Sequence, residues 1–105
     1  MSVLYVHPVQ RSGELLSLVR SAIESEIARL ELALERAEQR LRVFEERYGV
    51  TSEYFISTMV AEDLQGGDDE YVQWAGEYRL AQRLREKLHR LREIEYSDSG
   101  VLQPD

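Results

Sequence analysis

The chain has 105 residues, of which 20 are acidic and 13 basic, a net charge of -7, and no cysteine. This length limits it to one small domain, and the absence of cysteine excludes disulfides, thiolate zinc sites and a cysteine nucleophile. The acidity argues against direct nucleic-acid binding, because phosphate affinity comes mostly from clustered Lys and Arg. No stretch has the length and apolarity of a membrane span or a signal peptide, so we expect a cytoplasmic protein.

Residues 1–13 are predicted to form an N-terminal arm. They contain the only β-like run, Val3 to Val6. Four residues cannot form a sheet by themselves, so this run is either an unstructured arm or a strand that pairs with a second chain.

A long helix is predicted from Glu14 to Arg47, because this stretch lacks Gly and Pro and is rich in Leu, Ala, Glu and Arg. Its apolar residues recur every three or four positions, which is typical of a coiled-coil seam. Gly49 follows the last of them and suits the left-handed conformation that ends many helices. The predicted seam residues are Leu16, Val19, Ile23, Ile27, Leu30, Leu34, Ala37, Leu41, Phe44 and Tyr48.

Two further helices are predicted. A short one spans Ser52 to Asp63 and is capped by Thr51 or Ser52; a break at Leu64 to Gly67 follows. The last helix has Asp68 as its N-cap and runs to Tyr96, and residues 97–105 are predicted to be a flexible tail. The apolar stripe of this last helix is Tyr71, Trp74, Tyr78, Ala81, Leu84, Leu88 and Leu91.

The predicted fold is therefore all-α: a long, coiled-coil-like antiparallel helical hairpin over residues 14–96, with a short helix at the bend. Two helices bury only one stripe, so we expect two copies to form a homodimeric four-helix bundle. The residues predicted to oligomerise are Leu30, Leu34, Leu41, Leu84, Leu88 and Leu91.

The stretch from Tyr48 to Glu70 contains six acidic residues and no Lys or Arg. Such an acidic surface beside aromatic rings can imitate the phosphates and bases of a nucleic acid and attract a basic protein. The alternative is that the acids cap helices and keep a loop solvated, while the aromatics, Phe55 and Trp74 in particular, fill the bend. The predicted partner-binding residues are Tyr48, Tyr54, Phe55, Glu62, Asp63, Asp68, Asp69, Glu70, Tyr71, Trp74 and Tyr78.

No catalytic residue, cofactor or metal site is predicted. Glu86 and His89 have the E-x-x-H spacing found in ferritin-like metal bundles. Helical geometry nevertheless directs both away from the leucine stripe, so a di-metal site remains only a minor alternative. The acidic stretch lacks the ligand alternation of an EF-hand, and His7 has no partner at a meaningful spacing. We therefore expect a protein that is not an enzyme.

The segment from Phe44 to Ile94, about half of the chain, resembles small prokaryotic helical, antitoxin-like proteins that are often encoded beside a toxin gene. The resemblance rests on Phe44-x-x-Arg47-Tyr48-Gly49-Val50, Ser52-x-Tyr54-Phe55, Gly67-Asp68-Asp69, Trp74, and the repeat Leu84, Leu88, Leu91. It implies neutralisation of a partner toxin by tight binding. The helix that precedes Phe44 lies mostly outside this pattern.

Two hypotheses follow. In the first, the chain is the antitoxin of a toxin–antitoxin system and its acidic bend binds a basic partner through aromatic anchors. In the second, it is a structural coiled-coil homo-oligomer with no dedicated ligand, and its acidic bend serves only solubility.

Overall fold

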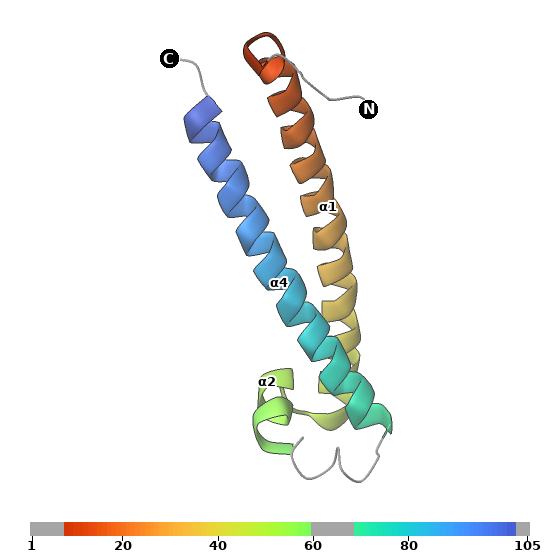
Figure 1. The fold of residues 1–105 in the computed structure, drawn as a ribbon. Helices are drawn as coiled ribbons and strands as arrows, with labels where there is room; N and C mark the ends of the chain where they lie inside the picture. The colour runs from red at the N-terminus through yellow and green to blue at the C-terminus, as the bar shows by residue number, and fades with distance from the viewer. Residues whose placement is uncertain (1–7, 60–68, 103–105) are drawn as a thin grey trace, which may run out of the picture.

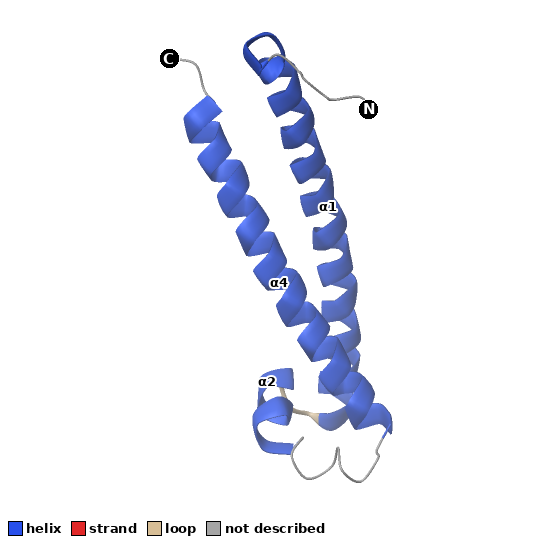
Figure 2. Ribbon diagram, in the orientation of Figure 1, coloured by secondary structure: helices blue, strands red, loops and turns tan. Residues whose placement is uncertain are grey.

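The computed structural model describes residues 8–59 and 69–102, and their side chains over 13–58 and 69–95. Within these ranges nearly every residue is helical and none lies in a strand (Figure 2). The elements are α1 (Pro8–Tyr48), α2 (Ser52–Tyr54), the π-helical turn η1 (Phe55–Met59) and α4 (Asp69–Leu102).

The two long helices, α1 and α4, run antiparallel and form a hairpin, with α2 and η1 beside its closed end (Figure 1). The predicted all-α hairpin is thereby confirmed for the described residues. Three predictions lie outside them: the Val3 to Val6 strand, the Asp68 cap and the break at Leu64 to Gly67.

Both long helices extend beyond their predicted ends. α1 begins at Pro8 rather than Glu14, and α4 continues to Leu102 rather than stopping at Tyr96. Residues 8–13 and 97–102 are therefore helical and not part of an arm or a tail. Proline is accommodated in the first turn of a helix, where its missing N–H is not needed. A glycine such as Gly13 costs a helix only about 1 kcal/mol relative to alanine and does not by itself end it.

The bend has the predicted helix stop but a different short helix. Gly49 has a φ of +70°, and its N–H donates to the Glu45 carbonyl at 2.8 Å. Thr51 is the N-cap of α2, since its Oγ1 accepts from the Tyr54 N–H at 3.0 Å. The predicted single helix is instead an α-helical turn that widens into the π-helical η1, and the rest of its predicted range, residues 60–63, lies outside the described part.

The hairpin is held by two clusters of buried side chains. Next to the bend, Leu41, Phe55, Trp74 and three alanines form a bend core. Farther along, Ile27 and Leu30 of α1 pack on Leu88 of α4, with Ile23, Leu34, Leu84 and Leu91 around them; these residues are the hairpin seam.

All six leucines predicted to oligomerise belong to or border these clusters within one hairpin. Leu30, Leu41 and Leu88 are buried, and Leu34, Leu84 and Leu91 are half-buried against the same clusters. The antiparallel hairpin turns the leucine stripe of α1 towards that of α4, so one chain covers three of these leucines fully and three in part. Helical periodicity indicates the apolar face but not which chain covers it.

The seam is also shorter than predicted. Its outermost members are Ile23 and Leu91, while Val19 is 43% exposed. Leu15, Leu18 and Ile94 are similarly exposed near the open end of the hairpin. The predicted continuation of the seam to Leu16 and Val19 is therefore not sealed within one chain.

Candidate protein-binding surfaces

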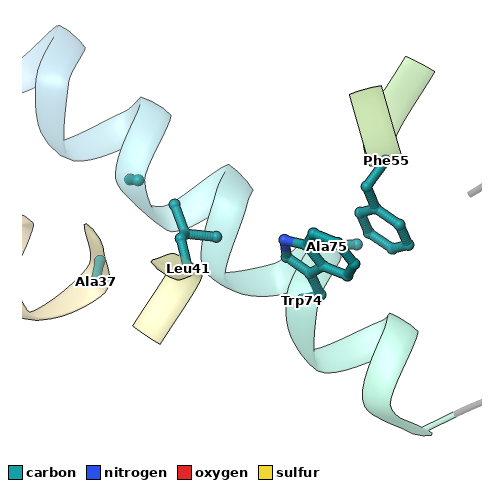
Figure 3. Close-up of a cluster of buried hydrophobic side chains, with 6 residues drawn as sticks. Ala37, Leu41, Phe55, Trp74 and Ala75 are labelled. Carbon is teal, nitrogen blue, oxygen red and sulfur yellow. The ribbon is translucent and has the colours of Figure 1, made fainter. Parts of the chain in front are cut away.

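Trp74, the only tryptophan of the chain, is the centre of the bend core. It is fully buried, and its ring lies parallel to that of Phe55 at a centroid distance of 3.9 Å (Figure 3). Phe44 and Tyr48 also stack on it, at 5.5 and 5.4 Å. Stacked aromatic pairs add to the free energy gained from burial. This cluster fixes α2 and η1 against both long helices.

A buried polar chain supports the same core. The Trp74 Nε1–H donates to Ser52 Oγ at 2.9 Å, and the Ser52 hydroxyl donates to Glu45 Oε2 at 2.7 Å. The Ser52 backbone N–H donates to the same carboxylate oxygen at 2.8 Å. From sequence, Ser52 is a candidate helix cap, a role that Thr51 fills in the structure. The hydrogen-bond partners of Ser52 come from α1 and α4, so the sequence around Ser52 carries no signal for them.

Replacing Ser52 with alanine is expected to lower the free energy of unfolding by about 1–3 kcal/mol, because the Trp74 indole N–H stays buried without an acceptor. The measurement is urea unfolding followed by circular dichroism. Ser57→Ala is the control, since the exposed Ser57 hydroxyl donates to the Tyr54 carbonyl at 3.2 Å. Equal losses for the two variants would contradict a special role for the buried chain.

The predicted partner-binding aromatics do not share one environment. Phe55 and Trp74 are fully buried and fill the bend, as the alternative interpretation of the aromatics expected, so the partner-contact role predicted for these two is wrong. Tyr48, Tyr71 and Tyr78 are half-buried against the bend core. Of the predicted aromatic anchors, Tyr54 is the most open, at 50% exposure. The 3.6-residue period of a helix shows on which face an aromatic ring lies but not how deeply it is buried, so buried and exposed rings were predicted to form one site.

The acidic residues at the bend are only partly described. Glu53 and Asp69 are exposed, and Glu70 forms an ion pair with Arg47 of α1. The predicted sites Glu62, Asp63 and Asp68 lie outside the described residues. In the described part of the bend, the exposed acidic residues are therefore Glu53 and Asp69. Glu53 directly precedes Tyr54 in α2, and Asp69 is the first residue of α4.

A groove between α1 and α4 was not predicted. It encloses about 390 Å³ and is lined by Arg40, Val43, Phe44, Gln73, Gly76, Glu77 and Leu80. Val43 and Leu80 are 53% and 37% exposed, and a Cβ added to Gly76 would meet nothing within 4 Å. Val43 and Leu80 are apolar residues outside the predicted seams, and this is the feature of the sequence that could have indicated an exposed apolar groove.

Charged side chains border the groove. Arg40 Nε donates to Glu77 Oε2 at 2.7 Å, and this bond joins the two helices. Glu77 Oε1 is buried with no hydrogen-bond partner.

A second ion pair joins the helices farther from the bend, where Lys87 Nζ lies 3.9 Å from Glu26 Oε2. The hydrogen bond from Arg29 holds the pKa of Glu26 below its usual range.

The described residues contain no group of three or more side chains suited to hold a metal ion. Glu86 and His89 are exposed, and His89 Nε2 lies 3.3 Å from Glu93 Oε1 on its own helix. Over the same described residues, neither long helix has an apolar run that could cross a membrane.

Comparison with known protein families, with curated proteins and with solved structures found no match. The surfaces of the hairpin are therefore the basis on which a function can be assigned.

Proposed function

We propose that this chain is a non-catalytic protein-binding module, the antitoxin of a toxin–antitoxin pair, which neutralises a basic partner by direct binding at the bend. The observation that carries the proposal is the position of Glu53 and the half-exposed Tyr54 in α2, directly before Phe55, whose ring is locked on Trp74. The acidic and aromatic groups thus sit on an ordered support.

An ordered support favours binding for an energetic reason. A surface that is fixed before binding loses less conformational entropy when a partner docks. The stack of Phe55 on Trp74 and the Ser52 hydrogen bonds provide that order. Aromatic side chains commonly supply interface energy, which Tyr54 can do here.

Charge supplies the preference for a basic partner. The chain has a net charge of -7, and residues 48–70 contain no Lys or Arg. A field of one sign speeds the approach of an oppositely charged protein and weakens as salt is added.

The test is co-expression of the tagged chain with each protein encoded by an adjacent gene, followed by affinity purification and light scattering. We expect one basic neighbour to arrest growth when it is expressed alone, and the chain to relieve the arrest and co-purify with that neighbour. Failure of every neighbour to bind or to be neutralised would overturn the proposal.

A pair of bend variants tests the site itself. Glu53→Lys combined with Asp69→Asn is expected to weaken the complex about ten-fold or more, mainly through slower association, and to leave the helical circular dichroism unchanged. The matched control is Glu24→Lys with Glu35→Gln, which makes the same charge change at exposed positions within α1. If both double variants weaken the complex equally, the loss of affinity comes from the change in net charge and not from the acidic residues of the bend.

A homodimeric scaffold, with two hairpins packed as a four-helix bundle, is the second candidate. It is favoured by the exposed leucines at the open end, Leu15 at 54% and Leu18 at 63%, together with Ile94 at 48%. Two copies could cover these side chains. Light scattering of the isolated chain would then give twice its 12.2 kDa mass, and Leu18→Glu would return it to one copy. A monomeric mass for the unaltered chain would reject this candidate.

A further inference from the structure

Apart from the residues at the open end of the hairpin, the exposed apolar side chains of α1 and α4 lie on the face of the groove. On α4, Val72, Gly76 and Leu80 follow one another at four-residue steps, which places them on one stripe. On α1, Val43 lies on the stripe that also contains Leu32, eleven residues before it. Val72, Val43 and Leu32 are 49%, 53% and 48% exposed. This stripe continues the lining of the groove beyond its ends.

The same face carries more basic than acidic residues although the chain is acidic. Five Arg or Lys residues lie on it, against Glu77 of the groove lining and the exposed Glu46 and Glu86. Arg36 and Arg40 precede Val43 on its stripe, and Arg83, Lys87 and Arg90 continue the stripe of Leu80. Arg40 and Lys87 pair with Glu77 and Glu26. Among the described residues, no ion pair involves the exposed Arg36, Arg83 or Arg90, so these cations are available to an incoming group.

Acidic residues occupy the opposite side of α1. Glu24, Glu31, Glu35 and Glu38 share a stripe by their steps of seven, four and three residues. Two of them pair across the hairpin with α4, Glu31 with Arg92 and Glu38 with Arg85. Residues 48–70 alone contribute six of the seven net negative charges, so the long helices are close to neutral and their charges are unevenly distributed around them.

We propose that the groove binds one amphipathic helix of a partner protein, with an apolar ridge that enters between Val43 and Leu80 and with Asp or Glu on its flanks. A helix that lays its apolar face in a groove is a common mode of protein recognition. The ridge would contact Phe44 and occupy the open space over Gly76, and its carboxylates would meet Arg36 and Arg83. This surface is separate from the acidic bend and does not depend on the function proposed for it.

Charge disfavours a second copy as the occupant. A two-fold symmetric dimer would place the groove face against itself. Arg36, Arg83 and Arg90 of one copy would then approach the same cations of the other. Like charges brought together at an interface cost free energy, whereas a carboxylate-flanked helix gains it from the same residues.

Trp74 provides a built-in reporter of binding. Phe44 lines the groove and its ring stacks on Trp74 at 5.5 Å, so an occupant that presses on Phe44 changes the environment of the only indole. A peptide without tryptophan can therefore be titrated into the full chain and followed by fluorescence.

The probes are two synthetic amphipathic helices with the same leucine ridge, one flanked by Glu and the other by Lys. We expect the Glu peptide to bind one to one, about ten-fold or more tighter than the Lys peptide, even though the chain itself is acidic. Its affinity should fall as salt rises, because exposed charges are screened. No binding of the Glu peptide, or equal binding of both peptides, would overturn the proposal.

Two variants locate the binding site. Gly76→Leu places a side chain in the groove, where an added Cβ would meet nothing within 4 Å, and should abolish binding while slightly stabilising α4, since glycine is a poor helix former. The matched control is Gly13→Leu, which makes the same change at an open position of α1 far from the groove. Arg36→Glu combined with Arg83→Glu should reverse the preference to the Lys peptide. If the unaltered chain is instead a dimer that Gly76→Leu dissociates, the occupant is a second copy and the proposal is wrong.

Discussion

Replacing Trp74 with alanine is expected to lower the free energy of unfolding by about 3–5 kcal/mol, the range for deletion of a large aromatic from a core. The ring is fully buried, stacks on Phe55, Phe44 and Tyr48, and donates a hydrogen bond to Ser52. Domains of this size have only about 5–15 kcal/mol of stability in total. Loss of this one side chain should therefore free α2 and η1 and bring the whole hairpin close to unfolding. The measurement is urea unfolding followed by circular dichroism.

Two controls separate the parts of this effect. Trp74→Phe retains an aromatic ring but loses the N–H, so its loss should be smaller than that of Trp74→Ala and comparable to that of Ser52→Ala. Tyr54→Ala removes a ring that is 50% exposed and should change stability little. A Trp74→Ala variant as stable as Tyr54→Ala would contradict the assignment of Trp74 as the centre of the bend core.

The hairpin could be predicted from sequence because its physical causes are local or periodic. The three- and four-residue spacing from Ile23 to Leu41 marks one face of α1, and Leu84, Leu88 and Leu91 mark the matching face of α4. Gly49, at a φ of +70°, is a local stop signal. Together these features are enough to fold one long helix back on another.

The ends of the helices could not be predicted as well. The stretch without Gly and Pro begins at Glu14, but α1 begins at Pro8 and includes Gly13, because both residues are compatible with a helix when the surrounding residues favour one. The π-helical η1 depends on the docking of Phe55 beneath Trp74, which is a tertiary contact. Local propensity cannot report such a contact.

The candidate sites were the least predictable part. Periodicity identifies the aromatic residues of the bend but not their depth, so from sequence Phe55 and Trp74 could be either partner contacts or filling of the bend. The groove arises where two helices meet, and its residues Val43 and Leu80 belong to neither predicted seam. Ion pairs such as Arg40 with Glu77 join distant parts of the sequence and become visible only once the register of the hairpin is known.

Replacing Leu88 with alanine is expected to lower the free energy of unfolding by about 2–5 kcal/mol, because the side chain is buried between Ile27 and Leu30 and its loss leaves a cavity. Leu80→Ala is the matched control, since Leu80 lies on the same helix but is 37% exposed and should cost clearly less.

A comparison of the unaltered chain with Leu88→Ala also decides whether the leucine seam lies within one chain or between chains. If the seam is internal, the melting temperature of the unaltered chain and of Leu88→Ala should not depend on protein concentration, because folding then involves a single molecule. A seam shared by two chains would instead make both melting temperatures rise with concentration, since association stabilises the folded state by mass action. A strong concentration dependence of both melting temperatures would support the oligomerisation role predicted for these leucines. Independence from concentration, combined with the large loss for Leu88→Ala, would place the leucine stripes inside the hairpin and leave the groove and the bend as the surfaces through which the chain meets other proteins.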